Sequence, residues 1–145
     1  MTFEDLPPDW PTRPVTDPDI TADVLDLVVR DADRVDGALC LLLCGEGRRL
    51  LQPLVIPRVP TTLRPDERRR VFEALRHVVE EGGMRGGVLL AVARARHASV
   101  TDDDRAWHEA AIDALGAIGI ELLGMWIVTR GVIRQMPDVR DQATA

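Results

Sequence analysis

The sequence contains no lysine, no asparagine and no tyrosine, so all 18 of its basic residues are arginine. These three absent amino acids share AT-rich codons, and their joint absence is typical of a GC-rich, bacterial genome. No apolar segment approaches the ~20 residues that a membrane-spanning helix needs. The N-terminal segment is acidic and rich in proline, unlike a signal peptide. The expected location is therefore the cytoplasm, without membrane contact.

Cysteine is scarce, with two residues at positions 40 and 44. On a strand they would share one face and lie more than ~10 Å apart, at about 3.3 Å per residue. That separation excludes a disulfide between Cys40 and Cys44. We expect buried, reduced thiols, as suits a reducing compartment. The sequence also lacks a Cys-x-x-Cys pair, a P-loop and a dinucleotide-binding fingerprint.

Positive charge is in deficit, since the net charge is −6 and the pI is about 5.0. A general nucleic-acid-binding protein needs a basic face, so that class is disfavoured. The one basic triplet, at 68–70, follows Asp66 and Glu67 and is predicted to be a solvated helix face. A chain of 145 residues favours one domain. We expect a proline-rich arm at 1–15, an α/β domain at 16–137 and a polar tail at 138–145.

Hydrophobic periodicity predicts three helices and five strands. A helix should begin at Thr16 or Asp17 and end before Gly37. Strands follow at 37–44 and 49–56 around a turn at 45–48, then a helix from Pro65 to Glu81 and a strand at 86–95. A helix capped by Thr101 should end at Gly116 or Gly119. A buried strand at 121–129 should follow, then a tight Arg130-Gly131 turn, in which glycine can take a positive φ, and a short last strand.

This order, α-β-β-α-β-α-β-β, predicts an α/β fold with three layers, helices covering both faces of a mixed sheet. The units between residues 65 and 129 require a crossover connection and hence parallel strands. Trp107 and Trp126 should both be largely buried. Two interpretations of the arm remain open: it packs on its own domain, or it docks on a partner subunit.

The loop after the strand at 86–95 is the best candidate site, because ligands of α/β sheets gather beyond the carboxyl ends of strands. Thr101 and Asp104 can form a capping box. His97 and Asp104 are the pair that could bind a metal, since histidine and carboxylate together suit zinc. A polar loop with a well-capped helix is the other interpretation. The candidate pocket residues are Arg96, His97, Ser99, Thr101, Asp102, Asp104 and His108, none of them assigned a catalytic role; His108 is expected in a surface ion pair and His77 in solvent.

Two segments, GALCLLLCGEGRRLLQPLVI and DRAWHEAAIDALGAIGIELLGMWIVTRG, resemble those of a known family in sequence and order. On these segments, residues 38–134 resemble the JAB metalloprotease-like fold, in particular its RadC-like branch, which shares its topology with the cytidine-deaminase-like fold. The metal motif of the family is His-x-His-Pro, a loop, and Ser-x-x-Asp. His97 matches its second histidine, and Thr101 to Asp104 match Ser-x-x-Asp. Ala95 stands in place of the first histidine and Ala98 in place of the proline.

The resemblance thus implies an incomplete zinc site, with the general-base glutamate of the family falling near Asp36. A catalytic zinc keeps three protein ligands and one open position, and loss of one ligand weakens both metal affinity and activation of water. We therefore expect a non-catalytic domain without a cofactor, a pseudoenzyme that binds or scaffolds a protein partner or forms a homodimer. The alternative is a zinc-dependent hydrolase of the peptidase or isopeptidase type, completed by Asp102, Asp103 or His108.

Overall fold

A computed structural model describes residues 3–60, 63–83 and 85–137. Its centre is a five-stranded sheet in the order β2-β1-β3-β4-β5. The strands are β1 (Ala38–Cys44), β2 (Leu50–Pro57), β3 (Gly87–Ala93), β4 (Leu122–Val128) and β5 (Ile133–Gln135). The helices are α1 (Thr21–Val28), α2 (Asp31–Asp36), α3 (Pro65–Glu73), α4 (Arg76–Gly82) and α5 (Asp102–Ala117), with short 3₁₀ turns at Phe3–Asp5, Trp10–Thr12 and Glu46–Arg48.

The sheet is mixed, as the element order predicts. Strand β1 is antiparallel to both β2 and β3, β3 is parallel to β4, and β5 returns antiparallel to β4. Helix α5 makes the crossover that the parallel pair requires. The carboxyl ends of β2, β3 and β4 therefore lie at one end of the sheet, beside the start of β1. The residues that follow these three strands meet there.

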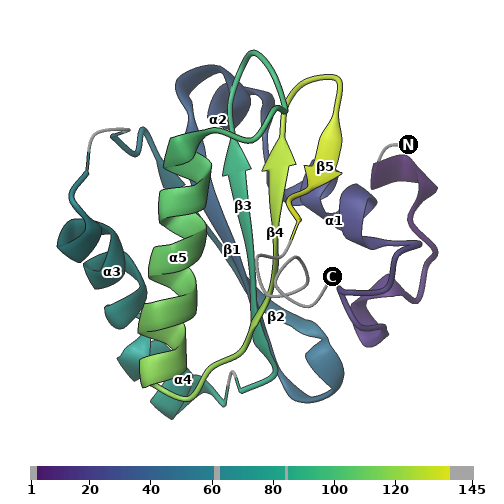
Figure 1. Ribbon diagram of the computed structural model, residues 1–145. Helices are drawn as coiled ribbons and strands as arrows, with labels where there is room; N and C mark the ends of the chain where they lie inside the picture. Colours follow the sequence, from purple (N-terminus) through teal and green to yellow (C-terminus); the bar gives the residue numbers. More distant parts are fainter. Residues whose placement is uncertain (1–2, 61–62, 84, 138–145) are drawn as a thin grey trace.

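Both faces of the sheet are covered, because β1 is buried along its whole length. Leu39, Leu41 and Leu43 pack on one face with α3, α4 and α5. Cys40 and Cys44 pack on the other with α1 and the N-terminal arm, as expected for two residues on one strand face. Figure 1 shows α3 and α5 on one side of the sheet and α1 on the other. This is the three-layer α/β/α arrangement expected from the sequence.

Two predicted helices are shorter than expected. The first begins at Thr21 rather than at Thr16 or Asp17 and is separate from α2. The Thr21 hydroxyl donates to the carbonyl oxygens of Val15 and Asp17, 2.5 and 2.9 Å away, which holds the preceding residues in a turn. The helix predicted from Pro65 to Glu81 is divided into α3 and α4, because the Leu75 amide donates to Phe72 in a tighter, three-residue turn.

The N-terminal arm packs on its own domain. Leu6 and Trp10 contact the cluster formed by α1 and β1, and Val15 belongs to that cluster. The Phe3 amide donates to the Asp26 carboxylate at 3.0 Å, and the Val15 amide donates to the Arg48 carbonyl at 2.9 Å. Of the two interpretations of the arm, this packing is the one present in the structure.

The burial of the two tryptophans and the last turn were also predicted from the sequence. Trp107 is 2% exposed, as predicted, whereas Trp126 is only partly buried. Trp126 pairs with Gln135 of β5, the short strand at the sheet edge, so less of the protein covers it. The predicted turn forms, with the Thr129 amide donating to Val132 at 2.8 Å. The φ angle of Gly131 is not positive, so the turn does not use this conformational freedom of glycine.

Within the part of the chain that the structure describes, no helix is both long enough and apolar enough to cross a membrane. The tail predicted at 138–145 lies outside the described residues.

Candidate functional site

The loop between β3 and α5 is held by one side chain, that of Arg94. Its guanidinium donates to the carbonyl oxygens of His97 at 2.7 Å and of Ser99 at 2.6 Å. It also donates to the carboxylate of Asp104 at 2.6 Å. The Arg94 amide is bonded to Val128 at the end of β4. One arginine thus ties the loop to the end of β3 and to the start of α5.

Asp104 is fully buried, at 0% exposure. Its Oδ2 accepts from the Thr101 amide at 2.8 Å, and the Asp104 amide donates to the Thr101 hydroxyl at 3.1 Å. The capping box predicted from the sequence is therefore formed. The other carboxylate oxygen, Oδ1, faces Arg94. Both oxygens are committed, one to the helix cap and one to a cation within the chain.

A zinc ion does not fit this donor set. A metal at Asp104 would have to displace the Arg94 guanidinium or open the helix cap. His97 is exposed, and among the described residues no three histidine, cysteine, aspartate or glutamate side chains are grouped as a metal site. Asp102 pairs with Arg105 at 2.8 Å, and Asp103 pairs with Arg68. The side chains proposed to complete a zinc site therefore have other ion-pair partners or, like His108, lie in the core.

The remaining predicted site residues are only partly brought together. Thr101 and Asp104 meet directly, and Arg94 joins them to the backbone of His97 and Ser99. The side chains of Arg96, His97 and Ser99 are exposed on the loop. These three residues are near one another in sequence. The loop is ordered by the backbone carbonyl groups that accept from Arg94, rather than by these side chains.

His108 is buried, at 3% exposure, so the expected position of this side chain at the surface is wrong. Asp104, Trp107, His108 and Ala111 follow the helical spacing of one stripe on α5, and all four are buried. His108 therefore belongs to the inward face of the helix. His77, in contrast, is exposed on α4, as predicted.

Arg68 corrects the expectation of a solvated basic triplet. It is 7% exposed, whereas Arg69 and Arg70 are exposed. Its guanidinium pairs with Asp103 and lies over the Trp107 ring, 5.5 Å from the centroid. The three arginines point in different directions around α3, and of the three only Arg68 faces α5.

A small pocket of about 140 Å³ opens beside this network. Its apolar wall comes from β1, β3 and α5 and includes Leu39, Val92 and Trp107, with Val59 contributed by the segment after β2. Its polar lining comprises Asp36, Arg94 and Asp103. The pocket therefore lies at the end of the sheet where the sequence places a site, but none of the seven predicted pocket residues lines it.

Arg94 is the residue that sequence reasoning missed, because it falls inside the segment predicted as a strand. The charge of Arg94 is the feature of the sequence that could have identified it. An arginine at the end of an otherwise apolar strand needs a partner at the sheet end, and the helix that follows begins with three carboxylates. No sequence pattern shows which of the three it meets.

In comparisons with known proteins, the chain matches no protein-family model and no curated protein.

Proposed function

We propose that the chain is a non-catalytic domain of JAB/RadC-like descent that binds a protein partner at the carboxyl end of its sheet. The element order and the mixed five-stranded sheet support the descent. The single observation that supports the absence of catalysis is the ion pair between Asp104 and Arg94, at 2.6 Å. Asp104 aligns with the metal-binding aspartate of the resemblance. In this chain the positive charge beside Asp104 is a guanidinium. Unlike a catalytic zinc ion, it has no open coordination position at which water is activated.

The size of the adjoining pocket supports a protein partner over a metabolite. Pockets for small molecules and cofactors span about 300–1,000 Å³, whereas this pocket measures about 140 Å³. A cavity of roughly 150 Å³ holds one benzene-sized group. The pocket therefore suits one apolar side chain of a partner, with Asp36 and Asp103 on its polar lining. A homodimer is the simplest such partner.

The metal content of purified variants tests the loss of catalysis. Protein purified without chelator should hold no stoichiometric zinc, and neither should Ala95→His, which restores His-x-His but leaves Asp104 paired. Adding Arg94→Met to Ala95→His should free the carboxylate and permit zinc binding. Stoichiometric zinc in the unchanged protein, lost in His97→Ala or Asp104→Asn, would overturn the proposal in favour of the hydrolase.

A photo-cross-linking residue tests the partner site. Placed at Val59, beside the pocket, it should give one dominant protein adduct in the cells that make the chain. Val92→Phe, which adds volume to the pocket wall from β3 on the face shared with Leu39 and Trp107, should abolish that adduct. The control position is Val78, which is 37% exposed on α4. The same adducts at both positions, or adducts that persist in Val92→Phe, would contradict binding at the pocket.

A further inference from the structure

Strand β5 is one edge of the sheet, and it is less protected than the other edge. Among the strands that the described residues form, β5 comes last in the order and pairs only with β4. The edge strand on the opposite side, β2, contains Pro53 and Pro57, and proline has no backbone donor. The three residues of β5 include no proline. An edge strand with free backbone groups is a template on which a further strand can pair.

The hydrogen bonds between β4 and β5 show which backbone groups of β5 face this edge. The Met136 amide donates to the Met125 carbonyl of β4 at 2.7 Å. Alternate residues of an antiparallel strand face opposite ways, so Arg134 also turns its backbone groups toward β4. Ile133 and Gln135 turn theirs toward the free edge. The edge therefore offers two amides and two carbonyls to an added strand.

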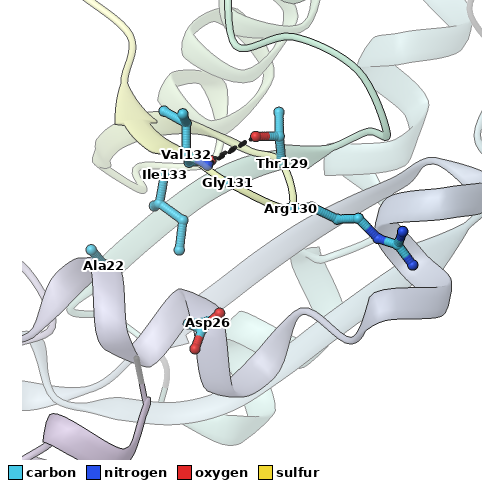
Figure 2. A pocket seen from close by; sticks show the side chains of 7 residues that line it. All are labelled: Ala22, Asp26, Thr129, Arg130, Gly131, Val132 and Ile133. Carbon is cyan, nitrogen blue, oxygen red and sulfur yellow. Dashed lines mark hydrogen bonds between the residues drawn. The ribbon is translucent and has the colours of Figure 1, made fainter. Parts of the chain in front are cut away.

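Two pockets lie beside this edge, on the face of the sheet that α1 covers. The first, of about 330 Å³, lies between α1 and the turn that joins β4 to β5, and the second, of about 250 Å³, lies between the start of α1 and β4. Ile133 lines the first, Gln135 lines the second, and Ala22 lines both. Figure 2 shows the Ile133 side chain pointing toward α1. Residues two apart on a strand repeat at about 7 Å on one face, as alternate side chains of any extended chain do.

Both pockets suit apolar side chains. The first has an aliphatic wall that includes Ala22 and Ile133. The carboxylate in its lining, that of Asp26, is neutralised by Arg34 at 2.9 Å. The second contains Trp126, which is only partly buried and so presents apolar surface. A cavity of roughly 150 Å³ holds one benzene-sized group, so each pocket has room for one aliphatic side chain.

Arg134 lies between these two positions, with its side chain on the opposite face of the sheet. It is exposed, and in the part of the chain that the structure describes its guanidinium has no ion pair or hydrogen bond. An acidic side chain directly opposite on an added strand gains a cross-strand ion pair. A second copy of the chain, paired antiparallel and centred on β5, would instead place two arginines opposite each other, which is destabilising. The charge therefore favours an acidic partner over a second copy.

We propose that the β5 edge binds an extended segment of a protein partner as a sixth, antiparallel strand with an apolar–acidic–apolar pattern. The two apolar side chains lie beside the two pockets, and the acidic side chain lies opposite Arg134. In this mode of recognition the backbone hydrogen bonds provide affinity, and alternate side chains provide specificity. The edge is separate from the pocket beside Trp107, so the proposal does not depend on the proposed function.

Blocked pentapeptides and ¹H–¹⁵N spectra of the full chain test the proposal. The peptide Thr-Val-Glu-Val-Thr should shift the amides of Ile133 and Gln135 saturably and slow their exchange with solvent. Methylation of the two valine nitrogens removes the donors that face β5 and should weaken binding about tenfold. Methylation of the glutamate nitrogen, which faces away, is the matched control and should change binding less than about twofold. No saturable shift, or equal binding of all three peptides, would overturn the proposal.

Charge reversal tests the position of the acidic side chain. The unchanged protein should prefer this peptide over Thr-Val-Lys-Val-Thr by about threefold, and Arg134→Glu should reverse the preference. Arg130→Glu changes an exposed arginine of the adjoining turn and should retain the preference for glutamate. The same preference in Arg134→Glu as in the unchanged protein would contradict the register. Shifts of the Ile133 and Gln135 amides that depend on protein concentration without peptide would place a second copy on the edge and would also overturn the proposal.

Discussion

Arg68 and Trp107 stack across the interface of α3 and α5, with the guanidinium carbon of Arg68 5.5 Å from the ring centroid. Phe72 meets the same ring edge-to-face, at 5.9 Å between centroids and an interplanar angle of 80°. Arg68 also pairs with Asp103 in the first turn of α5. The interface between α3 and α5 therefore has an aromatic centre with one ion pair beside it. This interface adjoins the proposed partner pocket.

The change Trp107→Ala should lower the free energy of unfolding by about 3–5 kcal/mol, the usual cost of truncating a buried aromatic side chain. The measurement is a urea melt. Trp126→Ala is the matched control and should cost distinctly less, because Trp126 is only partly buried. A loss under about 1 kcal/mol for Trp107→Ala would contradict the orientation of α5.

Arg68→Ala and Arg69→Ala form a matched pair on one helix. Arg68→Ala should lower the free energy of unfolding by about 2–3 kcal/mol, since it removes a buried stem and leaves Asp103 without its cation. Arg69 is exposed, and Arg69→Ala should stay within about 0.5 kcal/mol. Thermal and urea melts of both variants measure the difference. Equal effects would show that the Arg68 contacts contribute little.

The two thiols should resist modification in the folded protein. Burial raises the pKa of Cys40 to about 12 and that of Cys44 to about 11. The thiolate is the reactive form, so a disulfide reagent at pH 8 should label both thiols in urea and neither in its absence. Fast labelling of the folded chain would indicate that this face of β1 opens readily.

The same shifts predict lower stability in alkali. Each folded-state pKa lies above the unfolded value of about 8.5, so the contribution of the thiols to stability is complete below pH ~8. It is lost as the pH rises toward 11 and 12, because the unfolded state then releases protons that the folded state retains. Urea melts from pH 7 to pH 10.5 should show this decline, and it should be smaller in Cys44→Ala.

Removal of the arm should lower the stability of the domain and leave its oligomeric state unchanged. Deleting residues 1–13 removes Leu6 and Trp10, which pack beside α1, and should cost roughly 2–4 kcal/mol for the lost apolar contacts. Light scattering should give the same number of subunits before and after deletion. Phe3→Ser is the control, since Phe3 is 45% exposed. Conversion of a dimer to a monomer would indicate an arm that bridges subunits.

Two prolines should protect the free edge of the sheet. The Arg58 amide donates to Gly37 on the β1 side, and alternate residues of an antiparallel strand face opposite ways. Pro53 and Pro57 therefore lie where their backbone nitrogens face the free edge of β2, and neither carries a donor. Pro53→Thr with Pro57→Thr should restore two donors and increase self-association in light scattering. Gln52→Thr, whose amide already faces β1, should not.

The sequence determined the local structure to a useful degree. Apolar runs at 38–44, 87–93 and 122–128 identify buried strands, because only a covered sheet tolerates them. Thr101 and Asp104 specify the start of α5, because the capping box involves residues only three apart. The element order then leaves few arrangements other than a mixed sheet with helices on both faces.

The tertiary structure decided which charged residues lie inside. The burial of Arg68 depends on Asp103, 35 residues further along the chain, and that of Asp104 on Arg94. Burial of a charge is tolerable only where an opposite charge or a donor meets it. Periodicity shows which face of a helix is apolar, but it carries no information on which distant side chain completes an ion pair. For that reason the capping box of Thr101 and Asp104 was visible in the sequence, whereas the arginine beside Asp104 became visible only when the chain was folded.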